Sequence, residues 1–88
     1  MHFAWNLEKA AANLIKHGVA FEAVFNMDFD TGLVRADVRL AYPEPRLVAL
    51  APINGRLFML VYSIEPRRVR VISLRRANNR EKSRYAES

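Results

Sequence analysis

The spacing of the apolar residues changes once along this chain, and that change limits the folds open to it. In residues 7–15 apolar side chains recur at helical spacing, whereas residues 33–40 (LVRADVRL) alternate between apolar and polar. Helical spacing is typical of an amphipathic helix, and alternation is typical of a half-buried strand. The chain is therefore predicted to begin as helix and to continue as sheet, which is an α+β fold.

The first helix carries start and stop signals. Asn6 is suited to the N-cap, because its side-chain oxygen can accept a hydrogen bond from a first-turn N–H group. Gly18 stands where a left-handed residue commonly ends a helix. A second, shorter helix is predicted over residues 20–26. The apolar set of the first helix comprises Leu7, Ala10, Ala11, Leu14 and Ile15.

Four strands are predicted after residue 32, at residues 33–40, 46–51, 56–64 and 68–74. The pair Asn54-Gly55 separates two of them and favours a tight hairpin, since both central residues of a type I′ turn need positive φ. Residues 2–5 are suited to a short edge strand. In the strand 33–40 the face expected to be buried comprises Val34, Ala36, Val38 and Leu40.

A final helix is predicted after the last strand. Asn78 is its N-cap, and Glu81 stands three residues later as the partner in a capping box. The expected architecture is one domain over residues 1–88. It is an antiparallel sheet of about four strands, with two N-terminal helices and a C-terminal helix.

Several functional classes are excluded by composition. The chain has no cysteine, so it has no disulfide and no thiolate metal site. Its two histidines lack a second ligand at metal-binding spacing, and its three glycines form no phosphate loop. The apolar run 57–64 is far shorter than the roughly 20 residues that span a membrane. The N-terminus has no signal-peptide pattern. We expect a cytoplasmic protein with no membrane association, no metal and no cofactor.

The positive charge is concentrated in the last quarter of the chain. Residues 67–88 carry a net charge of +6, whereas residues 1–66 carry −1. Concentrated cationic charge attracts polyanions. The expected partner is therefore nucleic acid or an acidic protein.

The arginines of the last strand are candidate phosphate ligands. Alternation places Arg68 and Arg70 on one face with Ile72 and Leu74, and Ser73 on the other. A partly desolvated guanidinium requires a carboxylate or a phosphate. The alternative for Arg70 is an internal ion pair with Glu22 or Asp37.

The last helix adds further candidates. Arg80 and Arg84 align on one helix face, as RNA contacts or as an ordinary solvated face. Tyr85 is a packing anchor or a catalytic acid. Arg75 and Arg76 join the strand to this helix and are assigned to phosphate.

Proton-transfer groups lie near the end of the first helix. Lys16 and His17 precede the turn at Gly18, and Glu22 follows it. Such groups together with arginines suffice for RNA cleavage without a metal, because a base can remove the 2′-OH proton while cations stabilise the phosphorane. The helix dipole alone would also account for two cations at this helix end.

Two segments, one near each end of the chain, carry distinctive motifs. The first is "FAWNLEKAAANLIKHGVAFEAV", which contains K-H-G-V-x-F. The second is "GRLFMLVYSIEPRRVRVISLRRANNREKSRY", which contains R-[IV]-R-[IV]-I-S-x-R-x-A and a following Glu and Tyr. In these two segments the chain resembles the BrnT family of ribonuclease toxins from type II toxin–antitoxin systems. The first block matches at Phe3, Trp5, Lys9, Asn13, Lys16, His17, Gly18, Val19 and Phe21. The second matches at Arg68, Arg70, Ile72, Ser73, Arg75, Ala77, Glu81 and Tyr85.

The resemblance implies a RelE-like fold and a metal-independent endoribonuclease that inhibits translation. It also implies a ribbon-helix-helix antitoxin, which would form a hetero-oligomer that binds operator DNA. The active-site contributors that it implies are Lys16, His17, Glu22, Arg70, Arg75, Arg76 and Tyr85. The alternative that the residues leave open is a non-catalytic basic module that docks nucleic acid or an acidic protein.

Overall fold

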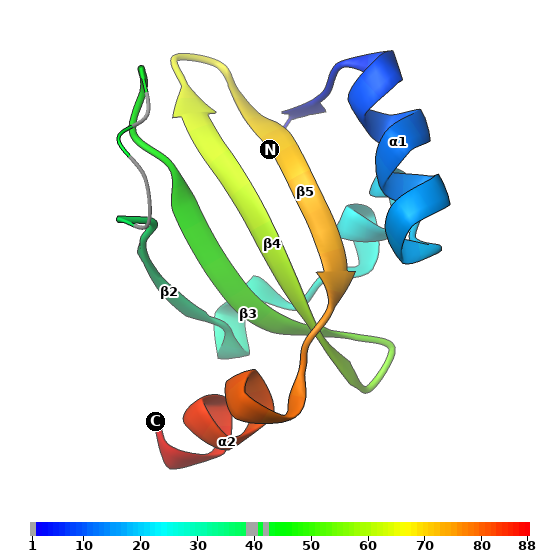
Figure 1. Ribbon diagram of the computed structural model, residues 1–88. Coiled ribbons are helices and arrows are strands. Elements are labelled where there is room, and N and C mark those ends of the chain that lie inside the picture. The colour runs from blue at the N-terminus through cyan, green and yellow to red at the C-terminus, as the bar shows by residue number, and fades with distance from the viewer. Residues whose placement is uncertain (1, 39–40, 42) are drawn as a thin grey trace.

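The computed structural model describes residues 2–38, 41 and 43–88 (Figure 1). Its α-helices are α1 (Leu7–His17) and α2 (Asn79–Glu87), and its 3₁₀ helices are η1 (Phe21–Asn26) and η2 (Phe29–Thr31). Its strands are β1 (Phe3–Ala4), β2 (Leu33–Ala36), β3 (Leu47–Ile53), β4 (Arg56–Glu65) and β5 (Arg68–Arg76). The end of the predicted first long strand, at Arg39 and Leu40, lies outside the described residues.

The predicted local signals are confirmed. The Asn6 side chain accepts a hydrogen bond from the Lys9 backbone N–H, and Gly18 ends α1 with φ 69°. Both bonds of the capping box between Asn78 and Glu81 are present at the start of α2. The second predicted helix is a 3₁₀ helix, whose N-cap residue makes no side-chain hydrogen bond. Short helical segments that connect longer elements frequently take this tighter form.

The sheet has five strands in the order β1-β5-β4-β3-β2. The turn between β3 and β4 has Asn54 at φ 50° and Gly55 at φ 82°, which confirms the predicted hairpin. The prediction of a purely antiparallel sheet was wrong, because β1 pairs with β5 in parallel. Alternation identifies a strand but not its direction. The direction of β1 is set by the long connection through α1 and the meander that separates it from β5.

Two apolar clusters lie on opposite faces of the sheet. One is formed between the sheet and the segment around η1, and its largest fully buried side chains are Phe21, Val24, Leu60, Val71 and Leu74. The other lies on the α2 side and comprises Val48, Leu50, Met59, Val61 and Ala77, with Tyr85 packed against it. Figure 1 shows α1 beside the β5 edge and α2 at the end of the sheet where β5 finishes.

A β-bulge in β5 changes the predicted faces of that strand. Val61 pairs with Ser73, while the next residue, Tyr62, pairs with Val71, so Ile72 is an extra residue. An extra residue reverses the alternation beyond it. Leu74 therefore lies in the same cluster as Val71 and not on the face of the arginines, as alternation had predicted.

Two predicted apolar faces are largely exposed. Val34 is 47% exposed and Val38 is 84% exposed, because β2 is the edge strand beyond the cover of η1. Leu7 and Ile15 of α1 are 79% and 88% exposed. The helix instead turns its Asn13 side toward the sheet. Helical spacing therefore identified the helix correctly, but of the predicted apolar set it is Ala10 that packs against the core, while Leu7, Leu14 and Ile15 are exposed.

Asn13 is the residue that holds α1 to β5. Its side-chain amide donates to the Leu74 backbone oxygen at 2.8 Å and to the Val19 oxygen at 2.9 Å, and its oxygen accepts from the Leu74 N–H at 3.2 Å. Asn13 is buried. β1 pairs only with the first part of β5, so this side chain takes the place of a strand partner further along β5.

Replacing Asn13 by alanine leaves buried backbone groups of Leu74 and Val19 without partners. We expect Asn13→Ala to lower the free energy of unfolding by about 2–4 kcal/mol. Urea denaturation measures this change. The control is Asn26→Ala at an exposed position, which is expected to change stability by less than about 0.5 kcal/mol. Equal stability of the two variants would contradict this role for Asn13.

Candidate active site

A series of cations lies at the end of the sheet where α1 and β5 finish. One hollow there is lined by Lys9, Lys16 and His17 beside Ser73. A second is lined by His17 and Arg76, and a third by Arg76 with Arg56 and Lys82. Of the residues described, no Asp or Glu lines any of these three hollows. We call this surface the basic rim; it comprises Lys9, Lys16, His17, Arg56, Arg76 and Lys82.

His17 has the electrostatics of a proton acceptor. Burial lowers its pKa below the usual 6.5, and the positive charges of Lys16 and Arg75 lower it further. An imidazole with a lowered pKa is neutral at pH 7 and can accept a proton. His17 lies four residues after Asn13 on the same side of α1, so the hydrogen bonds of Asn13 to Leu74 fix its position beside β5.

Arg75 is held by its own chain. Its guanidinium donates to both carboxylate oxygens of Glu81, each at 2.8 Å, and also contacts the Met59 sulfur. Glu81 is buried and at the same time accepts from the Asn78 N–H in the capping box. Arg75 therefore anchors α2 to β5, and its charge acts on His17 from a fixed position.

Arg68 and Arg70 lie at the other end of β5. Both donate to Glu65, at 2.5 and 2.6 Å, and these bonds lower the pKa of Glu65, with Arg70 contributing most. The internal partner of Arg70 is thus Glu65, and not Glu22 or Asp37 as the sequence had suggested. Arg70 and Arg75 are about 16 Å apart along the strand, at roughly 3.3 Å per residue. The structure does not bring Arg68 and Arg70 together with His17.

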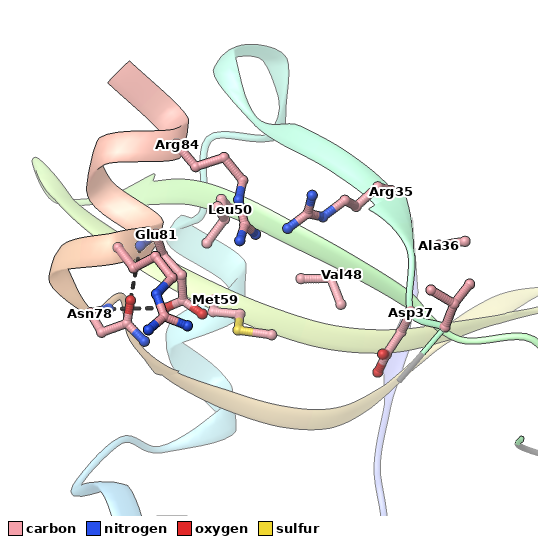
Figure 2. Close-up of a pocket in the computed structure, with 11 residues that line it drawn as sticks. Arg35, Ala36, Asp37, Val48, Leu50, Met59, Asn78, Glu81 and Arg84 are labelled. Atoms are coloured by element: carbon pink, nitrogen blue, oxygen red, sulfur yellow. Dashed lines mark hydrogen bonds between the residues drawn. The ribbon is translucent and has the colours of Figure 1, made fainter. Parts of the chain in front are cut away.

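A groove of ≈ 340 Å³ opens between β2 and α2 on the sheet face that carries α2 (Figure 2). Val48, Leu50 and Met59 form its apolar floor. Figure 2 shows Arg35 of β2 and Arg84 of α2 extending toward each other above this floor. Arg80 also lines the groove. Asp37, Glu81 and Asn78 complete its polar lining. We call it the arginine groove.

The arginines of this groove are available to an anionic ligand. Arg35, Arg80 and Arg84 form no ion pair with any residue that the structure describes. Sequence reasoning found Arg80 and Arg84 but missed Arg35. The sequence signal that could have found Arg35 is the alternation in its strand, which places it on the opposite face from Val34.

The two remaining predicted residues lie apart from the rim. The Tyr85 hydroxyl donates to the Thr31 backbone oxygen at 2.7 Å, and its ring packs against the second apolar cluster. These contacts are those of a packing anchor between α2 and the segment before β2. Glu22 is exposed on η1 and lines neither the rim hollows nor the groove.

The chain's family is shown by a match over most of its length. Residues 5–81 match the family model described as the ribonuclease toxin BrnT of type II toxin–antitoxin systems. The chain belongs to the BrnT family. It is thus a ribonuclease toxin of a kind that pairs with an antitoxin and acts on RNA. The match includes His17 and Arg76 of the rim but ends before Arg84 and Tyr85. No curated protein matches the chain.

Two further findings concern this BrnT chain. Across residues 2–38, 41 and 43–88, no group of three His, Asp or Glu side chains is placed to hold a metal ion. In the same part of the chain, no helix is both long and apolar enough to cross a membrane.

The lowered pKa of His17 can be measured directly. We expect NMR titration to give a value below 6.5, because burial and neighbouring cations disfavour the imidazolium. Removing one cation in Lys16→Met is expected to raise the value. Lys9→Met is the matched control, since Lys9 shares the hollow but does not shift the pKa. A wild-type pKa at or above 6.5 would contradict the assignment.

Proposed function

We propose that this BrnT protein is a metal-independent endoribonuclease whose basic rim cleaves RNA by attack of a 2′-OH on the adjacent phosphate. The observation that carries the proposal is the position of His17 among rim cations, in hollows that no described carboxylate lines and where burial, Lys16 and Arg75 lower its pKa. RNA cleavage of this type needs a base, an acid and positive charge at the phosphate. Lys16, His17 and Arg76 supply these groups.

Each rim residue has a distinct part in the proposed reaction. His17 removes the proton from the 2′-OH as the oxygen attacks phosphorus. Arg76 stabilises the charge that develops on the phosphorane, because its guanidinium can contact two phosphate oxygens. Lys16 donates a proton to the departing 5′-oxygen. The products are a 2′,3′-cyclic phosphate and a 5′-hydroxyl, and the two side chains then exchange protons with water.

The arginine groove is proposed to bind the RNA beyond the cleaved bond. Arg35, Arg80 and Arg84 would contact phosphates, and the floor of Val48, Leu50 and Met59 would contact a base. Arg75 connects the two regions, since it bonds to Glu81 of the groove and acts on His17 of the rim. The groove therefore contributes affinity, and the rim contributes the chemistry.

Assays of RNA cleavage in EDTA separate the contribution of the groove to affinity from the contribution of the rim to chemistry. His17→Gln is expected to lower kcat by about 100-fold or more while RNA binding persists, because it removes the base. Arg84→Gln is expected to raise KM with little change in kcat. Both are measured on one fluorescent RNA, with folding checked by circular dichroism. The matched control is Lys82→Gln, which removes one positive charge of the rim in a hollow that His17 does not line.

The outcomes of this panel distinguish the competing assignments. Intact RNA with folded wild type in EDTA, but bound RNA with a steep salt dependence, would favour the non-catalytic binding module. If Arg84→Gln loses much of its kcat while His17→Gln keeps its kcat, the catalytic site is assigned to the groove and not to the rim. Arg70→Ala is expected to lose less activity than His17→Gln, because Glu65 already pairs with Arg70. A loss of activity in Arg70→Ala as large as that in His17→Gln would indicate that Arg70 belongs to the catalytic site.

We further propose that the antitoxin is of the ribbon-helix-helix type, and that the hetero-oligomer binds operator DNA in the cytoplasm. This rests on the family assignment and on the resemblance to toxins of RelE-like fold. The basic rim, with no described carboxylate in its lining, suits an acidic segment of such a partner. Binding there would neutralise the rim charge and exclude RNA from His17.

Induction in cells provides the test of this partner. Expression of the chain is expected to arrest growth, and co-expression of a neighbouring ribbon-helix-helix gene is expected to relieve the arrest. His17→Gln is the control, because it should remain able to bind the antitoxin without arresting growth. Relief by an antitoxin of a different class would contradict the proposed type.

A further inference from the structure

The polar side chains of the arginine groove offer hydrogen-bond donors to a ligand. Both carboxylate oxygens of Glu81 accept from Arg75, and one of them also accepts from the Asn78 N–H. The Asn78 side-chain oxygen accepts from the Glu81 N–H, which leaves the amide N–H groups of Asn78. Asp37 is buried and already has an interaction partner. Among the described side chains that line the groove, the polar groups left for a ligand are therefore N–H groups.

Arg84 is half-buried and has no internal partner. Arg35 and Arg80, the other two arginines of the groove, are exposed. Arg84 forms no hydrogen bond and no ion pair with any residue that the structure describes. A partly desolvated guanidinium requires a group that accepts its hydrogen bonds. A ligand in the groove would therefore need to bring an acceptor to Arg84.

The floor of the groove determines what kind of acceptor fits there. Val48, Leu50 and Met59 make this floor apolar. A phosphate has acceptor oxygens but no apolar surface to place on such a floor. A nucleobase has both, because its faces pack against side chains while its edges carry hydrogen-bonding groups. The floor therefore favours a base over a phosphate at this position.

The donors of Arg84 distinguish among the four bases. Guanine presents two adjacent acceptors, O6 and N7, which match two N–H groups of one guanidinium. Adenine presents N7 beside an amino group, so one of the two contacts would place a donor against a donor. On the same edge, cytosine presents an amino donor and uracil presents a single acceptor. Guanine is therefore the base whose edge matches Arg84 best.

We propose that the arginine groove is a guanine-binding subsite, in which Arg84 donates to O6 and N7 of a base that lies on the apolar floor. This rests on the proposed function, in which the groove binds RNA beyond the cleaved bond. A guanidinium carries five N–H groups, so Arg84 can also contact the neighbouring phosphate. Arg35 extends from the opposite side of the groove and stays available to phosphates (Figure 2).

Binding of short RNAs tests the choice of base. The probes are fluorescent hexamers of 2′-O-methyl uridine with guanine, adenine, cytosine or uracil at one central position. The chain cannot cleave them, because the attacking hydroxyl is blocked. By fluorescence anisotropy, we expect the guanine hexamer to bind at least about tenfold more tightly than the other three. Replacing guanine by 7-deazaguanine removes N7 and is expected to abolish most of this preference, whereas inosine keeps O6 and N7 and should retain it.

Substitution of Arg84 tests the residue. Arg84→Lys keeps the positive charge but loses the pair of parallel N–H groups. We expect it to bind the guanine and adenine hexamers within about threefold of each other, and the all-uridine hexamer within about threefold of the wild type. Arg67→Lys is the matched control, because it makes the same change at an exposed residue outside the groove and the rim. It is expected to keep the preference for guanine. Circular dichroism checks that each variant is folded.

Two results would overturn the proposal. One is equal binding of the four hexamers by folded wild type. The other is loss of the guanine preference in Arg35→Lys or Arg80→Lys while Arg84→Lys keeps it.

The same probes separate this subsite from the chemistry of the rim, because they are not cleaved. Guanine-selective binding by a chain that leaves ordinary RNA intact would contradict the proposed cleavage and support the subsite. Cleavage of ordinary RNA by a chain that binds all four hexamers equally would contradict the subsite alone.

Discussion

The hydrogen bonds between the Asn13 side chain and the Leu74 backbone hold the candidate site together. β1 pairs with only the first part of β5, so the later residues of β5 would be left as an open edge beside α1. The Asn13 amide offers one donor and one acceptor there, as a neighbouring strand would. The C-terminal turn of α1 is thereby fixed against β5. His17 is consequently placed among the cations at the end of the sheet.

The β-bulge at Ile72 determines how the arginines after it are used. Because the extra residue reverses the alternation, Leu74 enters the core. Arg75 then lies on the sheet face that carries α2. Arg75 is then bound by Glu81, while Arg76 lines the rim with His17. The dense positive charge of the last quarter is thus divided. Some arginines are neutralised by Glu65 or Glu81, and others stay available to phosphate.

Much of the fold was predictable, because its signals are local. The caps at Asn6, Gly18 and Asn78 and the turn at Asn54 depend only on neighbouring residues, and all were predicted correctly. The parallel direction of β1 and the exposure of Val34 depend on which strands lie at the edges of the sheet. Of the residues predicted for the site, His17 lines one hollow with Lys16 and another with Arg76, whereas Arg35 joins the groove from a distant strand.

By itself, the sequence determined the α+β class, the ends of both helices, the concentration of positive charge and the resemblance to BrnT toxins. Each of these follows from the spacing, caps or identity of residues near one another in the chain. Only the tertiary structure decided which arginines are neutralised, because Glu65 meets Arg68 and Arg70 when β4 pairs with β5, and Glu81 meets Arg75 when α2 packs at the end of β5. It also decided which apolar residues stay exposed, because burial depends on the layer that covers each strand and not on the pattern of the strand itself.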